Sequence, residues 1–182
     1  MIRTNETHTG LHRAMDKMTD MLGGMHGRMK ANTAGSHSAS AFVENAAIGD
    51  MYEIEAAKIA LRRARSEDVR EAAQKMIHDH TTSTHQLKSA LRMNETKGLP
   101  APPQGVDERR KKMLEHLDAA PDDKFDETYM DQQVLAHKET VDLMTGFARG
   151  GDNVQLRSFA LGTAPVVIRH LDRMEAIRAK LA

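Results

Sequence analysis

The chain has 182 residues, which is enough for one domain of ordinary size. Its 26 Lys and Arg residues balance 26 Asp and Glu residues, so no net charge attracts it to nucleic acid, and no nucleic-acid partner is expected. The chain has no Cys, which excludes disulfides, thiolate metal sites and Cys nucleophiles. Any metal must therefore be bound by His, carboxylate or Met side chains.

The first thirty residues contain no uninterrupted apolar stretch, because charged residues and Gly recur every few positions. This pattern is not that of a secretory signal. No later segment approaches the roughly 20 apolar residues that cross a bilayer, so no membrane span is expected. The sequence as written therefore predicts a cytoplasmic protein, unless a signal lies upstream of an alternative start.

Residues 1–37 form the first predicted unit, an N-terminal arm and linker. Residues 10–30 predict an amphipathic helix interrupted at Gly23 and Gly24, and the small polar residues 31–40 resemble a linker. Because the linker separates the arm from the rest of the chain, deletion of residues 1–36 is expected to leave the melting midpoint nearly unchanged.

The predicted arm carries a stripe of Met residues at helical spacing, with two His residues nearby. Such a stripe is typical of an adaptable apolar face that packs on the rest of the chain, on a partner or on a second copy, so a homo-oligomer is one expectation. Thioether and imidazole groups together could alternatively bind Cu(I). The residues are Met15, Met18, Met21, Met25, Met29, His12 and His26.

Residues 38–182 form the second predicted unit, an antiparallel four-helix bundle, because helix formers dominate and β-branched residues never alternate over a run. The first helix is expected from Ala39 to Arg65. The second begins at Ser66, an N-cap followed by two acidic residues, and ends near Lys97 before Gly98 and the prolines. Their apolar stripes are Phe42, Ala46, Gly49, Ala56 and Ala60, and Val69, Ala73, Met76, His80, Leu87 and Leu91.

A long connection with a short helix at about 107–117 leads to the third helix, expected over 123–149. Asp152, followed by Gln155 at capping-box spacing, predicts the start of the fourth helix. Pro165 is expected to kink or divide this helix near Thr163 or Ala164. The two stripes are Met130, Val134, His137, Val141, Met144 and Ala148, and Phe159, Thr163, Val167, His170, Met174, Ile177 and Leu181.

Four segments together resemble the bacterial family called domain of unknown function 4142, over roughly Ala39 to Leu181. The resemblance implies a ferritin-like helical fold and no established activity. Many family members carry export signals and are labelled outer-membrane or periplasmic proteins, so the family pattern implies a periplasmic location. The segments are FVENAAIGDMYEIEAAKIAL, KMIHDHTTSTHQL, FDETYMDQQVLAHKETVDLM and LGTAPVVIRHLDRM.

One ionisable residue interrupts the apolar stripe of each predicted bundle helix: Glu53, His80, His137 and His170. Such a set could bind zinc, iron or another divalent ion. Alternatively, each His packs in the core and hydrogen-bonds a neighbour such as Glu53, Asp79 or Tyr129. A turn at Ser66 puts Glu53 level with His80, whereas a turn at residues 150–151 leaves His170 about 9 Å from the level of His137.

A ferritin-type di-iron site is disfavoured, because such sites use Glu-x-x-His pairs and no His here has Glu three residues before it. In the HDH run, adjacent residues point about 100° apart on a helix, so only His80 faces the core. His78 is expected at the surface, and Asp79 is expected to orient His80 or His85 from the flank.

The sequence therefore predicts an uncharacterised, ferritin-like bundle protein with a non-enzymatic binding or stress-associated role. The stress association rests on analogy with other small bundles. The first alternative is a metalloprotein that binds a divalent ion through inward His and Glu side chains. The second alternative is a self-association or partner-docking module that uses the Met-rich arm.

Overall fold

The computed structural model describes residues 10–32, 35 and 37–181. Within these residues the chain is all helical, with six α-helices, one short 3₁₀-helix and no β-strand, so the predicted all-α class is confirmed. The elements are α1 (Gly10–Asn32), α2 (Ala39–Arg63), α3 (Glu67–Ala90), η1 (Asn94–Thr96), α4 (Glu108–Ala119), α5 (Phe125–Gly150) and α6 (Val154–Lys180).

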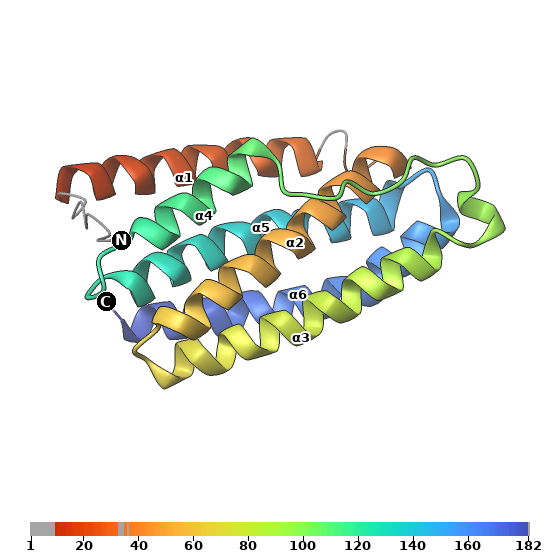
Figure 1. The fold of residues 1–182 in the computed structure, drawn as a ribbon. Helices are drawn as coiled ribbons and strands as arrows, with labels where there is room; N and C mark the ends of the chain where they lie inside the picture. The colour runs from red at the N-terminus through yellow and green to blue at the C-terminus, as the bar shows by residue number, and fades with distance from the viewer. Residues whose placement is uncertain (1–9, 33–34, 36, 182) are drawn as a thin grey trace.

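Four long helices, α2, α3, α5 and α6, contact one another in a closed circuit and are called the core helices below (Figure 1). Residues 64–66 join α2 to α3, and residues 151–153 join α5 to α6. Such short connections place consecutive helices side by side and antiparallel. The longer segment between α3 and α5 contains η1 and α4. Helix α1 lies outside the core helices, along α5 and against α4.

The interior consists of two apolar clusters with a layer of buried polar residues between them. The first cluster includes Tyr52, Val69, Met76, Phe125, Met130 and Met174, and the second includes Phe42, Leu87, Met144, Phe147 and Leu156. Asp50, His80, His137 and His170 are also buried, each on a different core helix. Along each of these helices the polar position falls between the residues of the two clusters.

The starts of α2, α4 and α6 are capped by side chains that accept hydrogen bonds from backbone N–H groups, whereas the side chain of Ser66 does not cap α3. Asp107 accepts from Arg110 N at 2.7 Å to start α4, and Asn153 accepts from Leu156 N at 3.0 Å to start α6. The prediction that Asp152 caps the last helix is therefore wrong. Its carboxylate instead accepts from Ala39 N at 2.8 Å, which ties the start of α2 to the connection between α5 and α6.

One expected helix end and two expected breaks within helices differ from the structure. Helix α3 ends at Ala90 rather than near Lys97, and the hydroxyl of Thr96 donates to the Ala90 carbonyl at 3.0 Å in the turn that follows. Helix α6 continues through Pro165 without being divided there. Helix α1 likewise continues through Gly23 and Gly24, because helical packing against α4 and α5 overrides the low helix propensity of glycine.

One face of α1 docks on the core through small and polar residues. Asp20 accepts a hydrogen bond from His116 at 2.8 Å and another from the Gln132 amide at 2.7 Å, and the Gln132 oxygen accepts from Tyr52 at 3.1 Å. These four residues are called the α1 interlock. A Cβ at Gly27 would meet the carboxylate of Glu139, so a larger residue at that position would displace this carboxylate.

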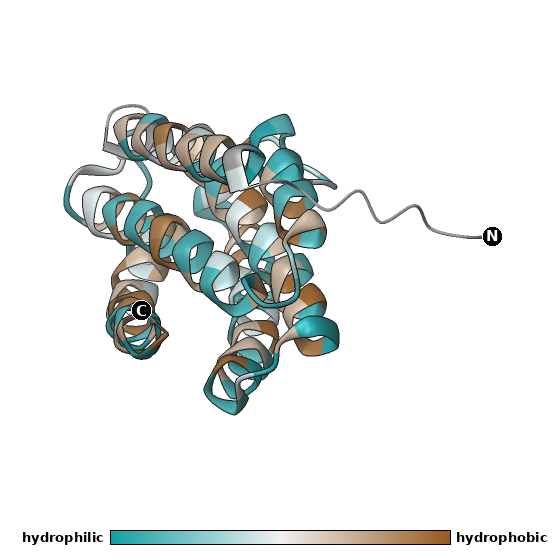
Figure 2. Ribbon diagram, turned by 90° about the vertical axis from the view of Figure 1, so that its left-hand side faces the viewer, coloured by the Kyte–Doolittle hydropathy of each residue, from teal (hydrophilic) through white to brown (hydrophobic). Residues whose placement is uncertain are grey.

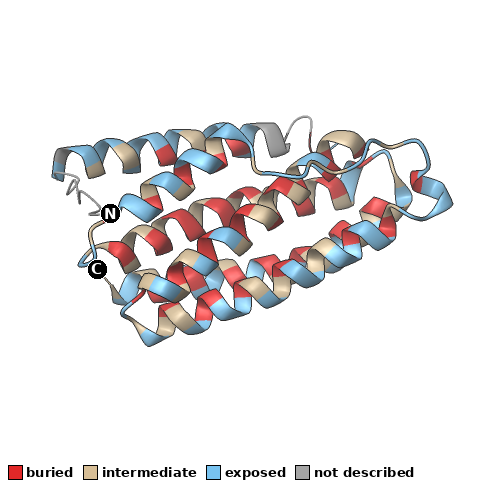
Figure 3. Cartoon of the chain, viewed as in Figure 1, coloured by how far each residue is buried: buried red, intermediate tan, exposed pale blue. Residues whose placement is uncertain are grey.

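The Met stripe lies on the opposite face of α1, and the expectation that it packs on the rest of the chain is wrong. The outer side of α1 is largely exposed in Figure 3. The exposed fractions are 53% for Met15, 54% for Met18, 48% for Met21, 57% for Leu22, 60% for Met25 and 68% for Met29. The docked face carries Asp20, Gly24 and Gly27 instead.

Hydrophilic and hydrophobic residues alternate along the long helices in Figure 2. None of the described helices has the length and sustained apolar character that a bilayer crossing needs.

Candidate metal centre

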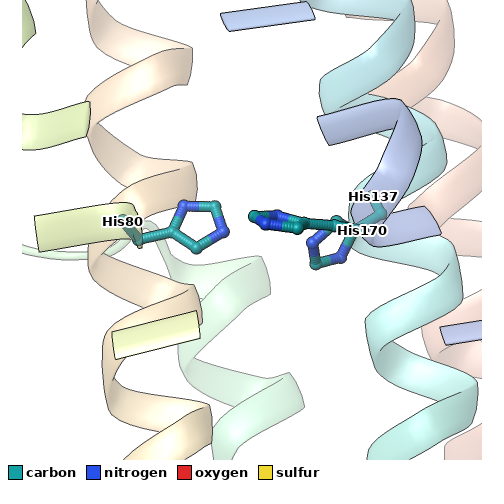
Figure 4. Close-up of side chains that lie close together, drawn as sticks. All are labelled: His80, His137 and His170. Atoms are coloured by element: carbon teal, nitrogen blue, oxygen red, sulfur yellow. The ribbon is translucent and has the colours of Figure 1, made fainter. Parts of the chain in front are cut away.

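Three histidines from three core helices meet in the polar layer. His80 on α3, His137 on α5 and His170 on α6 each offer one ring nitrogen such that these nitrogens lie within 4.8 Å of one another. The ring centroids are 5.6 to 6.0 Å apart. Figure 4 shows His80 approaching from one side, with His137 and His170 opposite it. The three rings are almost fully enclosed, with exposed fractions of 5%, 1% and 3%.

A hydrogen-bond acceptor holds one nitrogen of each ring. Nδ1–H of His80 donates to Asp50 at 2.8 Å, and Asp50 also accepts from the Thr84 hydroxyl at 3.2 Å. Nδ1–H of His137 donates to the backbone carbonyl of Gln133 at 2.9 Å. These bonds fix the orientation of two rings. In the neutral form of each ring, they place its single N–H on the outer nitrogen, Nδ1.

The third ring is also held through one nitrogen, but that nitrogen is Nε2 rather than Nδ1. Nε2–H of His170 donates to Asp79 at 2.8 Å, and Lys75 lies 2.9 Å from the same carboxylate. The inner nitrogens of the three rings, Nε2 of His80, Nε2 of His137 and Nδ1 of His170, are buried and have no hydrogen-bond partner. An unpartnered buried polar atom costs about 1 to 3 kcal/mol, so three in one place require an explanation.

The surroundings of the rings determine which of them carry charge. Burial lowers the pKa of His137, and it lowers the pKa of His170 to about 4 with a further contribution from the nearby His137. Burial opposes protonation of His80 as well, but the hydrogen bond and charge of Asp50 outweigh it, and the pKa of His80 is raised. Two of the rings are therefore neutral near pH 7, which is the form of imidazole that binds a metal.

Glu53 lies beside the histidine cluster rather than within it. Its Oε1 is 3.6 Å from Nδ1 of His137, the nitrogen that faces away from the other two rings. Its Oε2 accepts a hydrogen bond from the Gln133 amide at 2.7 Å. Of the four predicted ligands, the structure thus brings the three histidines together and places the carboxylate behind one of them.

The heights expected from the sequence are partly wrong. The connection between α2 and α3 is centred on Arg65, so His80 lies level with Asp50, one helical turn from Glu53. The connection between α5 and α6 is centred on Asp152, which reduces the expected offset between His137 and His170, and their rings meet. Side chains also lean toward the N-terminus of their helix, which closes the remaining gap between antiparallel neighbours.

The residues that orient the rings were largely missed. Asp50 lies three residues before Glu53, so the same helical face was readable from the sequence. Asp79 was expected as a hydrogen-bond partner of a core histidine, and it holds His170 on α6, whereas the expectation that it orients His80 or His85 is wrong. The backbone carbonyl of Gln133 carries no side-chain signal. His78 is exposed, as predicted.

The fold and the site define an all-helical protein with three histidines clustered in its interior. A family model described as "Domain of unknown function (DUF4142)" matches residues 25–177. The chain belongs to this family, as the four sequence segments indicated, and the match includes all three histidines. No curated protein and no solved structure was found to match the chain.

Proposed function

We propose that this protein binds one divalent transition-metal ion through His80, His137 and His170. The observation that carries the proposal is the set of three inward, unpartnered ring nitrogens, each opposite a nitrogen that is already held. An ion at the centre of the cluster would satisfy all three at once. Carboxylate and carbonyl groups behind metal-bound histidines are the usual means of fixing the ring orientation.

The donor set favours zinc or ferrous iron. Imidazole nitrogens bind zinc at about 2.0 to 2.1 Å, which puts tetrahedral ligand atoms roughly 3.3 Å apart. The three nitrogens already lie within 4.8 Å of one another, so small rotations of the rings would complete the site. Three protein ligands leave a coordination position for water or another small ligand, as in zinc sites that are not purely structural. The absence of thiolates disfavours selectivity for soft ions.

Glu53 would act on the ion without binding it. Its carboxylate lies beside Nδ1 of His137, so its negative charge would favour a cation at the centre of the cluster. We further propose that the core helices form a ferritin-like four-helix bundle, which their closed circuit of contacts and two short connections support. The binding role expected from the sequence would then be metal binding. The stress-associated role stays a prediction that no particular residue supports.

A thermal titration tests the proposal. Protein prepared without a His tag is stripped with a chelator, and its melting midpoint is measured with increasing zinc or ferrous iron. A ligand that binds only the folded state stabilises it by about 2.7 kcal/mol at a free concentration one hundred times its Kd. The wild type should therefore melt several degrees higher with the bound ion.

His80→Leu should abolish this increase, even though the lost hydrogen bond to Asp50 also lowers its metal-free midpoint. His78→Gln is the matched control, because His78 is exposed on the same helix two residues earlier. The control should retain the increase in full. An increase of equal size in His80→Leu would show that the metal binds elsewhere and that the three histidines are packed core residues.

A further inference from the structure

Six of the exposed large apolar side chains in the described part of the chain lie on one face of α1, and the metal site does not explain them. Six large apolar side chains line this face between Met15 and Met29, and each is 48 to 68% exposed. Isolated exposed apolar residues are common, but a continuous row of them usually marks an interaction surface. Within the described residues α1 docks through its opposite face, so these six side chains keep about half or more of their surface exposed.

The charges around this face disfavour a polar partner. Lys17 and Arg28 lie on the flank of α1 nearest α5, and each is paired with an α5 carboxylate, Asp131 at 2.7 Å and Asp142 at 2.6 Å. The residues that border the row, Ala14, Thr19 and His26, carry no fixed charge. Among the described side chains, this face therefore offers neither a free cationic patch for a polyanion nor an acidic patch for a basic partner.

The spacing of the row fits another helix. Met15, Met18, Leu22, Met25 and Met29 follow one another at alternating steps of three and four residues, which is the pattern of a helix–helix seam. The docking contacts of Asp20 and Gly27 hold α1 in place, so the row is presented on a fixed support.

The pattern is also nearly symmetric along the helix. Met15 and Met29 each lie seven residues from Leu22, whereas Met18 lies four residues before it and Met25 three residues after it. A two-fold axis near Leu22 would therefore place Met against Met when two α1 helices run antiparallel. A two-fold interface requires this kind of self-complementarity, because one patch must meet its own copy.

The area of the face is sufficient for such an interface. The six exposed side chains correspond to roughly 600 Å² of surface, and a standard interface buries roughly 800 Å² on each partner. Ala14, Thr19 and His26 are exposed beside the row and would supply much of the difference. We infer that this face binds a second copy of the chain, with two α1 helices packed antiparallel across a two-fold axis.

Sedimentation equilibrium of the full chain over a concentration series tests this inference. The wild type should be a dimer, and M18E/M25E should be a monomer at the same concentrations, because like charges would then face one another across the axis. We expect the dissociation constant to rise on the order of a hundredfold or more. M93E is the matched control, since Met93 is 49% exposed outside this face, and it should remain a dimer.

Mixing two charge variants tests the symmetry and guards against misfolding. M18K/M25K should also be a monomer alone, but an equimolar mixture with M18E/M25E should form heterodimers, which requires both variants to be folded. M18L/M25L should keep the dimer, because an apolar seam needs no sulfur. Three results would overturn the inference: a wild type that is monomeric, an M18E/M25E variant that is dimeric, or a mixture that stays monomeric. A loss of association in M18L/M25L would overturn it too, because it would indicate Cu(I) bound to thioethers.

Discussion

Two buried polar regions lie within this protein, and they differ in how completely their atoms are paired. In the α1 interlock, each polar atom of the Asp20, Gln132 and Tyr52 side chains has a partner. In the histidine cluster, one nitrogen of each ring is held and the other faces its neighbours without a partner. The first region is a fully paired structural contact, whereas the second leaves three buried ring nitrogens that an ion at its centre would satisfy.

The largest expected effect concerns the fully paired region. Deletion of residues 1–36 removes the interlock and the packing of α1, and we expect it to lower the free energy of unfolding by about 3 to 5 kcal/mol. The linker-like composition of residues 31–40 predicted the opposite result. Chemical denaturation monitored by circular dichroism measures the change.

A point substitution locates this effect. Asp20→Leu should account for about 2 to 3 kcal/mol of the loss in stability. The Gln132 amide and Nδ1–H of His116 would lose the carboxylate to which they donate, while α1 itself stays in the chain. Glu71→Leu is the control, since Glu71 forms an exposed ion pair with Arg173, and such pairs contribute about 0 to 1 kcal/mol. If the deletion left stability unchanged, α1 would be a dispensable arm after all.

The next effect concerns the groups behind the rings. Asp50→Asn keeps the shape of the side chain but weakens the acceptor for Nδ1–H of His80. We expect it to lower zinc affinity about 10- to 100-fold while all three ligands remain. Isothermal titration calorimetry measures the affinity. Asp118→Asn, on the exposed C-terminal turn of α4, is the control and should bind as tightly as the wild type; equal affinities in both variants would remove Asp50 from the site.

The pH dependence of the metal-free protein separates the two regions in another way. The pKa of His170 is lowered by burial to about 4, so below the unfolded value of about 6.5 the unfolded chain binds a proton that the folded chain does not. This contribution to stability is present above pH 6.5 and is lost as the pH falls toward 4. His170→Leu lacks this titration.

The stability of the wild type relative to His170→Leu should therefore fall by about 1 to 2 kcal/mol between pH 7 and pH 4.5. Denaturation curves of the two metal-free proteins at both pH values measure the difference. A difference that does not change with pH would mean that His170 is solvated in the folded protein.

The smallest expected effect tests the close approach of α1. Gly27→Ala forces a Cβ toward the Glu139 carboxylate, which Arg109 and Arg110 already hold, so the gain in helix propensity should be outweighed and stability should fall by about 1 kcal/mol. Gly162→Ala is the matched control, because nothing lies within 4 Å of its Cβ, and it should gain about 0.5 to 1 kcal/mol. Equal gains at both positions would show that α1 does not pack closely at Gly27.

The sequence predicted the helices and the ring positions because both depend on helical periodicity. The stripes placed His80, His137 and His170 toward the interior, and all three are buried. Which residues of neighbouring helices lie side by side depends instead on where each connection is centred. A small error in that centre made Glu53 the expected neighbour of His80, whereas the observed partner is Asp50. Periodicity alone does not fix that register.

The outward direction of the Met stripe could not be predicted for a related reason. A helix with apolar residues on one side usually turns that side inward. In α1 the face that carries Asp20, Gly24 and Gly27 docks instead. Its glycines permit close approach, and the Asp20 carboxylate accepts hydrogen bonds from His116 and the Gln132 amide. That choice depends on residues of α4 and α5 far away in the sequence.

The metal content of purified protein tests the central claim most directly. Protein made without a His tag, in medium supplied with zinc and iron, is dialysed extensively and measured by mass spectrometry of the elements. The metal-binding account predicts one ion per chain in the wild type and in His78→Gln, and almost none in a chain with His80, His137 and His170 all changed to Leu. Wild-type protein that holds no ion under any metal supply, or a triple variant that holds as much as the wild type, would contradict it.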